Sequence, residues 1–271
     1  MKYLIRIAFF LMTILPFQSH AGWLINGRFI DREGNTIMKR YFIEDNVIKV
    51  EQYNLLYICN LKTESIIIVD PVNLVYTKTT LSAYIAKMRQ IKMNRLNELL
   101  ELIPADQKKD YENRYRAQAE QDIILPAFND DSLRLTQLPD SLKLLGYPTL
   151  KFNIYDNGRK KEEFFMTPEV NISADLDMKT FLKYVYLLEP DDHTVKYMTS
   201  AKYLETVKNG FVTRRFIFEE GYRTEWQVNK IDKKDIPAYE FGAPDLCKEV
   251  TLDKWLSRKS TVDENYYDDY E

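Results

Sequence analysis

The segment Asp191-Asp192-His193 holds the residue types that most often bind metal ions, two carboxylates beside an imidazole. Adjacent residues cannot easily all face one ion, and the chain has a second histidine only at His20, within its N-terminal leader. The segment follows Pro190 and lies between two predicted helices, so we interpret it as a loop whose aspartate caps the next helix. The sequence therefore predicts neither a metal site nor a cofactor.

Other patterns of catalytic chemistry are absent from the sequence. It contains no Gly-x-Ser-x-Gly motif, and neither cysteine stands in an activating motif. Only 8 glycines occur, and none forms a phosphate-binding loop. The 41 aspartates and glutamates could supply a glycosidase-like pair from distant positions, although no pattern marks one. We therefore predict a protein that is not an enzyme, with an unrecognised hydrolase as a further alternative.

The two cysteines, Cys59 and Cys247, allow two interpretations. In an oxidising compartment they could form a disulfide that joins an early strand to the C-terminal segment. Cys59 lies within Tyr57–Leu61, which has the pattern of an ordinary strand, so two separate buried thiols fit as well. Both alternatives stay open from the sequence.

The compartment is predicted from the N-terminus. Lys2 and Arg6 precede an apolar stretch, residues 7–17, which has the length of a signal peptide rather than of a membrane span. Ser19-His20-Ala21 then predicts cleavage between Ala21 and Gly22, the alternative being an uncleaved anchor helix. We therefore expect a periplasmic or secreted protein. Its net charge of −3 and its lack of a basic block argue against a nucleic-acid partner.

The first part of the mature chain predicts an antiparallel meander. Short apolar runs of strand length alternate with turn residues from Gly22 to Thr79, and the intervals are too short for crossover helices. The predicted strands after the first are 37–44, 47–52, 55–61, 65–69 and 74–79.

A long amphipathic helix is predicted to follow, capped by Thr79 or Thr80, beginning at Leu81 and ending near Pro104. The polar run 105–121 predicts a second helix. Residues 122–145 are expected to form a loop with one extended piece, 133–138. The remaining predicted elements are a hairpin (149–155 and 160–166) turning at Asn157-Gly158, helices at 177–188 and 194–208, a second hairpin (211–218 and 222–231), a last ordered piece at 236–255, and a disordered acidic tail at 257–271.

Several short motifs in this order of elements resemble exported bacterial proteins of the outer-membrane lipoprotein-carrier fold. The motifs are an early glycine-containing strand, Ile68-Val69-Asp70 ahead of Tyr76, Gly146-Tyr147-Pro148, and Ile236-Pro237 followed by Phe241 and Pro244. The resemblance implies an α+β fold: one domain, residues 22–256, with a curved antiparallel sheet that forms an incomplete barrel and helices packed on its concave face. Relatives with known roles shield acyl chains in that cavity.

From the resemblance we predict a periplasmic carrier that holds a lipid, an acyl chain or a lipoprotein anchor between sheet and helices. The apolar face of the long helix supplies the candidate cavity residues Tyr84, Ile85, Met88, Ile91 and Leu99. The alternative is an interaction module with a filled core, whose polar helix or tyrosine-rich tail contacts an envelope protein.

Overall fold

A computed structural model describes residues 21–52, 54–121, 128, 130–188, 194–219 and 221–258. Three of the expected features lie outside these residues: the leader before Ala21, the Asp191-Asp192-His193 loop, and the tail after Arg258. The last described residues, 252–258, are helical, so the first two residues of the predicted disordered tail, 257 and 258, lie in a helix.

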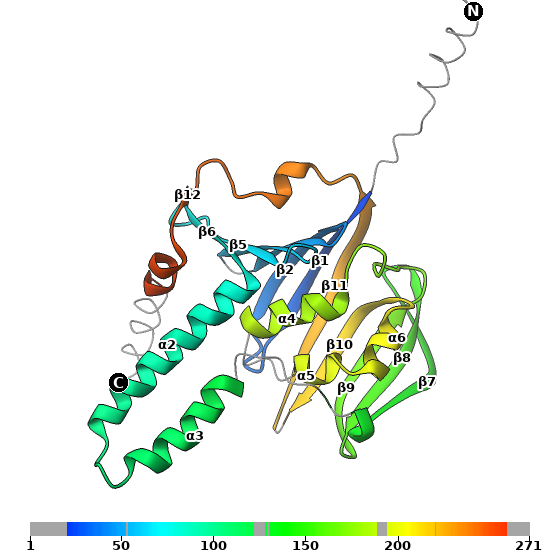
Figure 1. The fold of residues 1–271 in the computed structure, drawn as a ribbon. Helices are drawn as coiled ribbons and strands as arrows, with labels where there is room; N and C mark the ends of the chain where they lie inside the picture. The colour runs from blue at the N-terminus through cyan, green and yellow to red at the C-terminus, as the bar shows by residue number, and fades with distance from the viewer. Residues whose placement is uncertain are drawn as a thin grey trace, which may run out of the picture.

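Twelve strands of the described chain form one open sheet in the order β12-β6-β5-β4-β3-β2-β1-β11-β10-β9-β8-β7. Every pairing is antiparallel except that of β12 with β6. The open sheet is curved, with helices on its concave side (Figure 1), which confirms the predicted α+β class and the incomplete barrel. The strands are β1 (Gly22–Ile30), β2 (Thr36–Glu44), β3 (Val47–Gln52), β4 (Leu55–Asn60), β5 (Ser65–Asp70), β6 (Val75–Thr80), β7 (Leu133–Leu144), β8 (Tyr147–Asp156), β9 (Arg159–Thr167), β10 (Phe211–Glu219), β11 (Tyr222–Lys234) and β12 (Lys248–Glu249).

Turn chemistry explains why two hairpins of the sheet, β2–β3 and β8–β9, could be predicted. Asp45 and Asn46, which join β2 to β3, have φ of 49° and 63°. Asn157 and Gly158, which join β8 to β9, have φ of 49° and 77°. Left-handed residues in two-residue turns match the twist of the strands that they connect, and Asn, Asp and Gly adopt that conformation most readily. The predicted hairpins are therefore confirmed at these positions.

Strand β7 is longer than the extended piece predicted at 133–138. It continues through Pro139 to Leu144, and its pairing with β8 shifts between Leu138 and Ser141. Because β7 is the last strand of the sheet, a bulge there accommodates a proline that has no N–H to donate. The prediction of a loop after 138 was therefore wrong.

The helices are α2 (Leu81–Leu102), α3 (Lys108–Gln121), α4 (Met178–Leu188), α5 (Thr194–Met198) and α6 (Ala201–Val207), with short 3₁₀ turns η1 (Asp130–Ser132) and η2 (Ala238–Phe241). Thr80 caps α2 as expected, since its side chain accepts a hydrogen bond from the N–H of Ala83. The helix predicted at 194–208 is instead two helices, because Ser200 leaves the helical conformation and its side chain caps α6 through the N–H of Tyr203.

The helices divide into two groups in space. Figure 1 shows α4, α5 and α6 in front of the concave face, where α4 and α6 share a buried core with β8 and β9. The antiparallel pair α2–α3 instead extends away from the sheet. Only the first turns of α2 join the main core, through Leu81 and Tyr84. The concave face is therefore covered by the later helices rather than by the long early one.

The segment 235–249, which we call the C-terminal strap, crosses the opposite, convex face (Figure 1). The Lys49 ammonium lies 2.7 Å from a Glu240 carboxylate oxygen of the strap and 4.7 Å above the ring of Phe42. The strap ends in β12, beside β6. The helical residues 252–258 follow and return Trp255 to the main core.

The position of the C-terminal strap also decides whether Cys59 and Cys247 can form a disulfide. Cys59 lies on β4, and Cys247 immediately precedes β12. Since β5 and β6 separate these strands, the cysteine backbones lie roughly 14 Å apart at the usual strand spacing. A disulfide needs Cα atoms less than about 7 Å apart. Both cysteines are free thiols, so the disulfide alternative is wrong.

Candidate functional site

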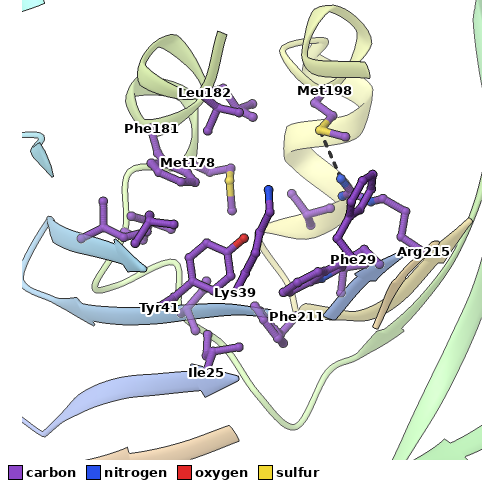
Figure 2. A pocket seen from close by; sticks show the side chains of 18 of the residues that line it. Ile25, Phe29, Lys39, Tyr41, Met178, Phe181, Leu182, Met198, Phe211 and Arg215 are labelled. Carbon is purple, nitrogen blue, oxygen red and sulfur yellow. Dashed lines mark hydrogen bonds between the residues drawn. The ribbon is translucent and has the colours of Figure 1, made fainter. Parts of the chain in front are cut away.

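A cavity of about 1760 Å³ lies between the concave face of the sheet and helices α4 and α6 (Figure 2). It exceeds the roughly 300–1,000 Å³ typical of small-molecule pockets. Strands β1–β4, β10 and β11 form its floor, and the helices form the opposite wall. The wall residues that Figure 2 labels on the helices are mostly apolar: Met178, Phe181, Leu182 and Met198.

The floor is arranged in rows across neighbouring strands, and the rows change in character along the cavity. The first row, Ile43, Ile48 and Cys59, is almost completely buried. The second row consists of Ile25, Tyr41, Val50 and Tyr57, and its two tyrosines are partly exposed. The third row is Gly27, Lys39, Gln52 and Leu55. Polarity and exposure therefore increase together from one end of the cavity to the other.

Gly27 leaves room for an aromatic floor. A Cβ atom at this position would lie 2.1 Å from Cη2 of Trp226, so the indole can lie against β1 only because residue 27 has no side chain. The Trp226 ring also meets the ring of Tyr41 edge-on, with centroids 5.7 Å apart. The two rings thus form a continuous amphipathic surface on the cavity floor.

A buried polar cluster fixes α5 and α6 to the sheet beside the cavity. Arg215 of β10 places its Nε 2.7 Å from Oε1 of Glu162, and Tyr197 donates to Oε2 of the same carboxylate at 2.6 Å. Arg215 also donates to the hydroxyl of Tyr203 and approaches the sulfur of Met198 at 3.4 Å (Figure 2). Glu162 is fully buried, and burial together with this carboxylate raises the pKa of Tyr197. The cluster is therefore a neutralised ion pair that positions the helical wall.

The other end of the helical wall is held at the start of α4. The backbone N–H of Asn46 donates to the carbonyl of Asp175, and the Trp23 indole N–H donates to the Asp175 carboxylate at 2.8 Å. Asp177 caps α4 by accepting from the N–H and hydroxyl of Thr180. Burial raises the pKa of Asp177, but the hydrogen bonds from Thr180 and its neighbours lower the pKa by more. The net pKa of this carboxyl therefore lies below its ordinary value.

We expect Asp177→Ala to lower the free energy of unfolding by about 1 kcal/mol near neutral pH, the usual cost of a lost cap. Because the folded-state pKa of Asp177 is lowered, its charge contributes stability above the ordinary carboxyl pKa, and that stability is lost as the pH falls through the folded value. Urea unfolding from pH 7 to pH 3 should show the difference from wild type shrinking. Asp177→Ser, which keeps a cap without the charge, serves as the control; a difference that stays constant with pH would contradict the assignment.

The five candidates from α2 do not line this cavity. Tyr84 is buried in the main core, and Ile85 and Met88 pack against that core from the base of α2. Ile91 and Leu99 are 37% and 40% exposed on the projecting part of the helix. The structure thus moves the cavity wall from α2 to α4 and α6, because α2 turns away from the sheet after its first turns.

Sequence reasoning missed Lys39, Arg215 and Trp226 as cavity residues. A signal was present at β2, where Ile37, Lys39, Tyr41 and Ile43 alternate with outward residues and place one cation on an otherwise apolar face. Arg215 gave no such signal, since it follows another arginine and its partner Glu162 lies on a different hairpin.

The described residues of this site supply neither a metal-binding cluster nor an activated thiol. Among the described residues, no group of three or more His, Cys, Asp or Glu side chains could hold a metal ion. Cys59 lines the buried end of the cavity, where burial raises the pKa of its thiol, and a protonated thiol is a poor nucleophile. Over the same described stretches, no helix has the length and apolarity needed to cross a membrane.

The sequence matches no protein-family model and no curated protein. Among solved structures, an uncharacterised conserved protein from Thermus thermophilus aligns over 90% of this chain and 99% of its own, with 8% identity and a TM-score of 0.41. The Pseudomonas aeruginosa MucA/MucB complex aligns over 86% of this chain and 59% of its own, with 9% identity and a TM-score of 0.39.

A further solved structure is a putative outer-membrane lipoprotein-sorting protein domain from Vibrio parahaemolyticus. It aligns over 84% of this chain and 92% of its own, with 9% identity and a TM-score of 0.27. At these low values, the comparisons assign the chain to no family.

Proposed function

We propose that the protein is a non-enzymatic carrier that binds the acyl chain of a lipid or of a lipoprotein in the cavity between the sheet and helices α4 and α6. The observation that carries the proposal is the cavity itself, about 1760 Å³ in volume and lined mainly by aliphatic, aromatic and methionine side chains. A cleft of this size with a mainly apolar lining suits a flexible hydrocarbon chain, because burying the chain there removes its apolar surface from water.

The methionines of the helical wall fit this role. Met178 and Met198 face the cavity from α4 and α5 (Figure 2). Their flexible thioethers adapt to apolar ligands of irregular shape. The leader-like N-terminus makes export to the periplasm part of the same proposal, since such a carrier would work between membranes.

The test is to purify the protein from the cell envelope, to identify co-purified lipid by mass spectrometry, and to titrate it with the fluorescent fatty acid cis-parinaric acid. Thr224→Trp introduces a large ring on the cavity side of β11, and we expect it to remove most of the probe binding. Arg223→Trp is the matched control, because Arg223 is exposed on the opposite face of the same strand, where it lies over Phe216.

Two outcomes would reject the carrier. One is a wild-type protein that contains no lipid and binds no probe. The other is equal binding by wild type and Thr224→Trp while Arg223→Trp also binds normally, since this result would place the probe elsewhere.

A second candidate function, an envelope interaction module, is favoured by the α2–α3 pair. This pair projects from the sheet (Figure 1) and exposes apolar side chains, most of all Leu102, which is 82% exposed. Tyr111 and Tyr115 stack on α3 with centroids 4.1 Å apart. Exposed apolar residues gathered on a projecting element are typical of a protein contact.

A further inference from the structure

We propose that α2 is a dimer interface, in which its exposed face pairs in antiparallel orientation with the same face of a second copy of the chain. This inference goes beyond the proposed carrier function and does not depend on it.

Helix α2 has one heptad pattern along its whole length. Seven of its residues recur after three and four positions in turn: Leu81, Tyr84, Met88, Ile91, Arg95, Glu98 and Leu102. This spacing places their side chains along one face of the helix, as at the core positions of a coiled coil. We call these residues the heptad face.

The first half of the heptad face is packed within the protein, and the second half is exposed. Leu81 and Tyr84 are buried in the main core, and Met88 packs against it. Further along the helix, where α2 extends away from the sheet (Figure 1), Ile91 is 37% exposed and Leu102 is 82% exposed. The projecting half of α2 therefore continues a packing face into solvent.

Two opposite charges lie at the centre of this exposed half. Arg95 and Glu98 occupy consecutive positions of the heptad face, and both are exposed. Within the described chain, neither side chain forms an ion pair or a hydrogen bond. Polar residues at such positions specify the register and the orientation of the helices that pair there. The two charges thus predict which partner geometry fits.

Antiparallel pairing about a two-fold axis satisfies every layer of the exposed half. With the axis between residues 96 and 97, Arg95 lies opposite the partner's Glu98, and Ile91 lies opposite the partner's Leu102. The axis repeats both matches in the reverse sense, so two ion pairs lie between two apolar layers. A parallel pair would instead bring Arg95 against its own copy and Glu98 against its own copy, and like charges repel. The face is therefore complementary to itself in the antiparallel orientation alone.

The length of the exposed half sets the strength of the dimer. Residues 91–102 span about 17 Å of helix at the usual rise per residue. A contact of this length is at the small end of specific protein interfaces. We therefore expect a weak dimer that dissociates on dilution.

The experiment is sedimentation velocity of protein purified from the cell envelope, from micromolar to near-millimolar concentration. Wild type should shift from monomer to dimer as its concentration rises. Arg95→Glu and Glu98→Arg should each weaken dimerisation by at least about tenfold, because either change puts like charges opposite each other in both central layers. A mixture of the two variants should dimerise again, because each chain then meets the opposite charge on its partner.

The matched control is Arg89→Glu, which makes the same change of charge at an exposed position of α2 outside the heptad face. It should dimerise as wild type does. Urea unfolding at concentrations where wild type is monomeric should be alike for all of these proteins, because the substituted residues are exposed. That measurement separates a lost contact from a lost fold.

Three outcomes would overturn the inference. A wild type that stays monomeric over the whole range would mean that the exposed face has another partner or none. Dimers that persist unchanged in both single variants would place the contact elsewhere. Single variants that do not recover in the mixture would contradict the antiparallel register. The carrier function stands or falls separately, on the binding of cis-parinaric acid.

Discussion

Arg215→Met is expected to lower the free energy of unfolding by about 3–5 kcal/mol, the usual cost of removing one partner from a buried ion pair. The reason is Glu162, which is fully buried and would keep its carboxylate without the guanidinium 2.7 Å away. The same change should loosen α5 and α6, since Arg215 also contacts Tyr203 and Met198. Urea unfolding followed by tryptophan fluorescence measures the loss.

The double variant Glu162→Gln/Arg215→Met removes both charges while it keeps most of the side-chain volume. Removing both charges should restore much of the stability, because no buried ion then lacks a counter-charge. Arg40→Met, at an exposed ion pair, is the control and should cost less than about 1 kcal/mol. An Arg215→Met variant as stable as this control would show that the cluster does not hold the helical wall.

Trp255→Ala is expected to lower the free energy of unfolding by a similar amount, about 3–5 kcal/mol, the usual cost of truncating a buried aromatic side chain. Trp255 is buried in the main core together with Leu81, Tyr84 and Val250. It thereby anchors the end of the C-terminal strap to the base of α2. Thermal and urea unfolding would measure the loss.

Lys254→Ala is the matched control, since it alters the preceding, exposed residue of the same helix and should change stability by less than about 0.5 kcal/mol. A Trp255→Ala protein with wild-type stability would mean that the strap is held by β12 and the Lys49–Glu240 pair alone.

Local patterns were sufficient to predict most of the fold. Runs of alternating residues and turn pairs such as Asp45-Asn46 act within a few positions, so the strands β2–β6 and their hairpins could be predicted from the sequence. The α2 cap at Thr80 is local in the same sense. Where a local rule has two outcomes, the prediction failed: Pro139 reads as a strand end, yet an edge strand tolerates it through a bulge.

The candidate site was harder to predict because it depends on which helix the sheet encloses. The apolar residues of α2 have helical spacing, and that spacing cannot distinguish a helix inside the sheet from one that leaves it after two turns. The choice is made by contacts distant in sequence, such as Asp175 with Trp23 and Asn46. The Glu162–Arg215 pair likewise joins two hairpins that no local pattern connects.

The pairing of β1 with β11 has a consequence for how the chain reaches its folded state. In this pairing Gly22 lies opposite Lys234, so the first strand of the described chain pairs with the last but one. Until β11 arrives, a newly made meander β1–β6 presents the unpaired edge of β1, and such edges readily pair with other chains. Contacts this distant in sequence also slow folding. We therefore expect an aggregation-prone stage during folding, in which a chaperone or a low local concentration would raise the yield.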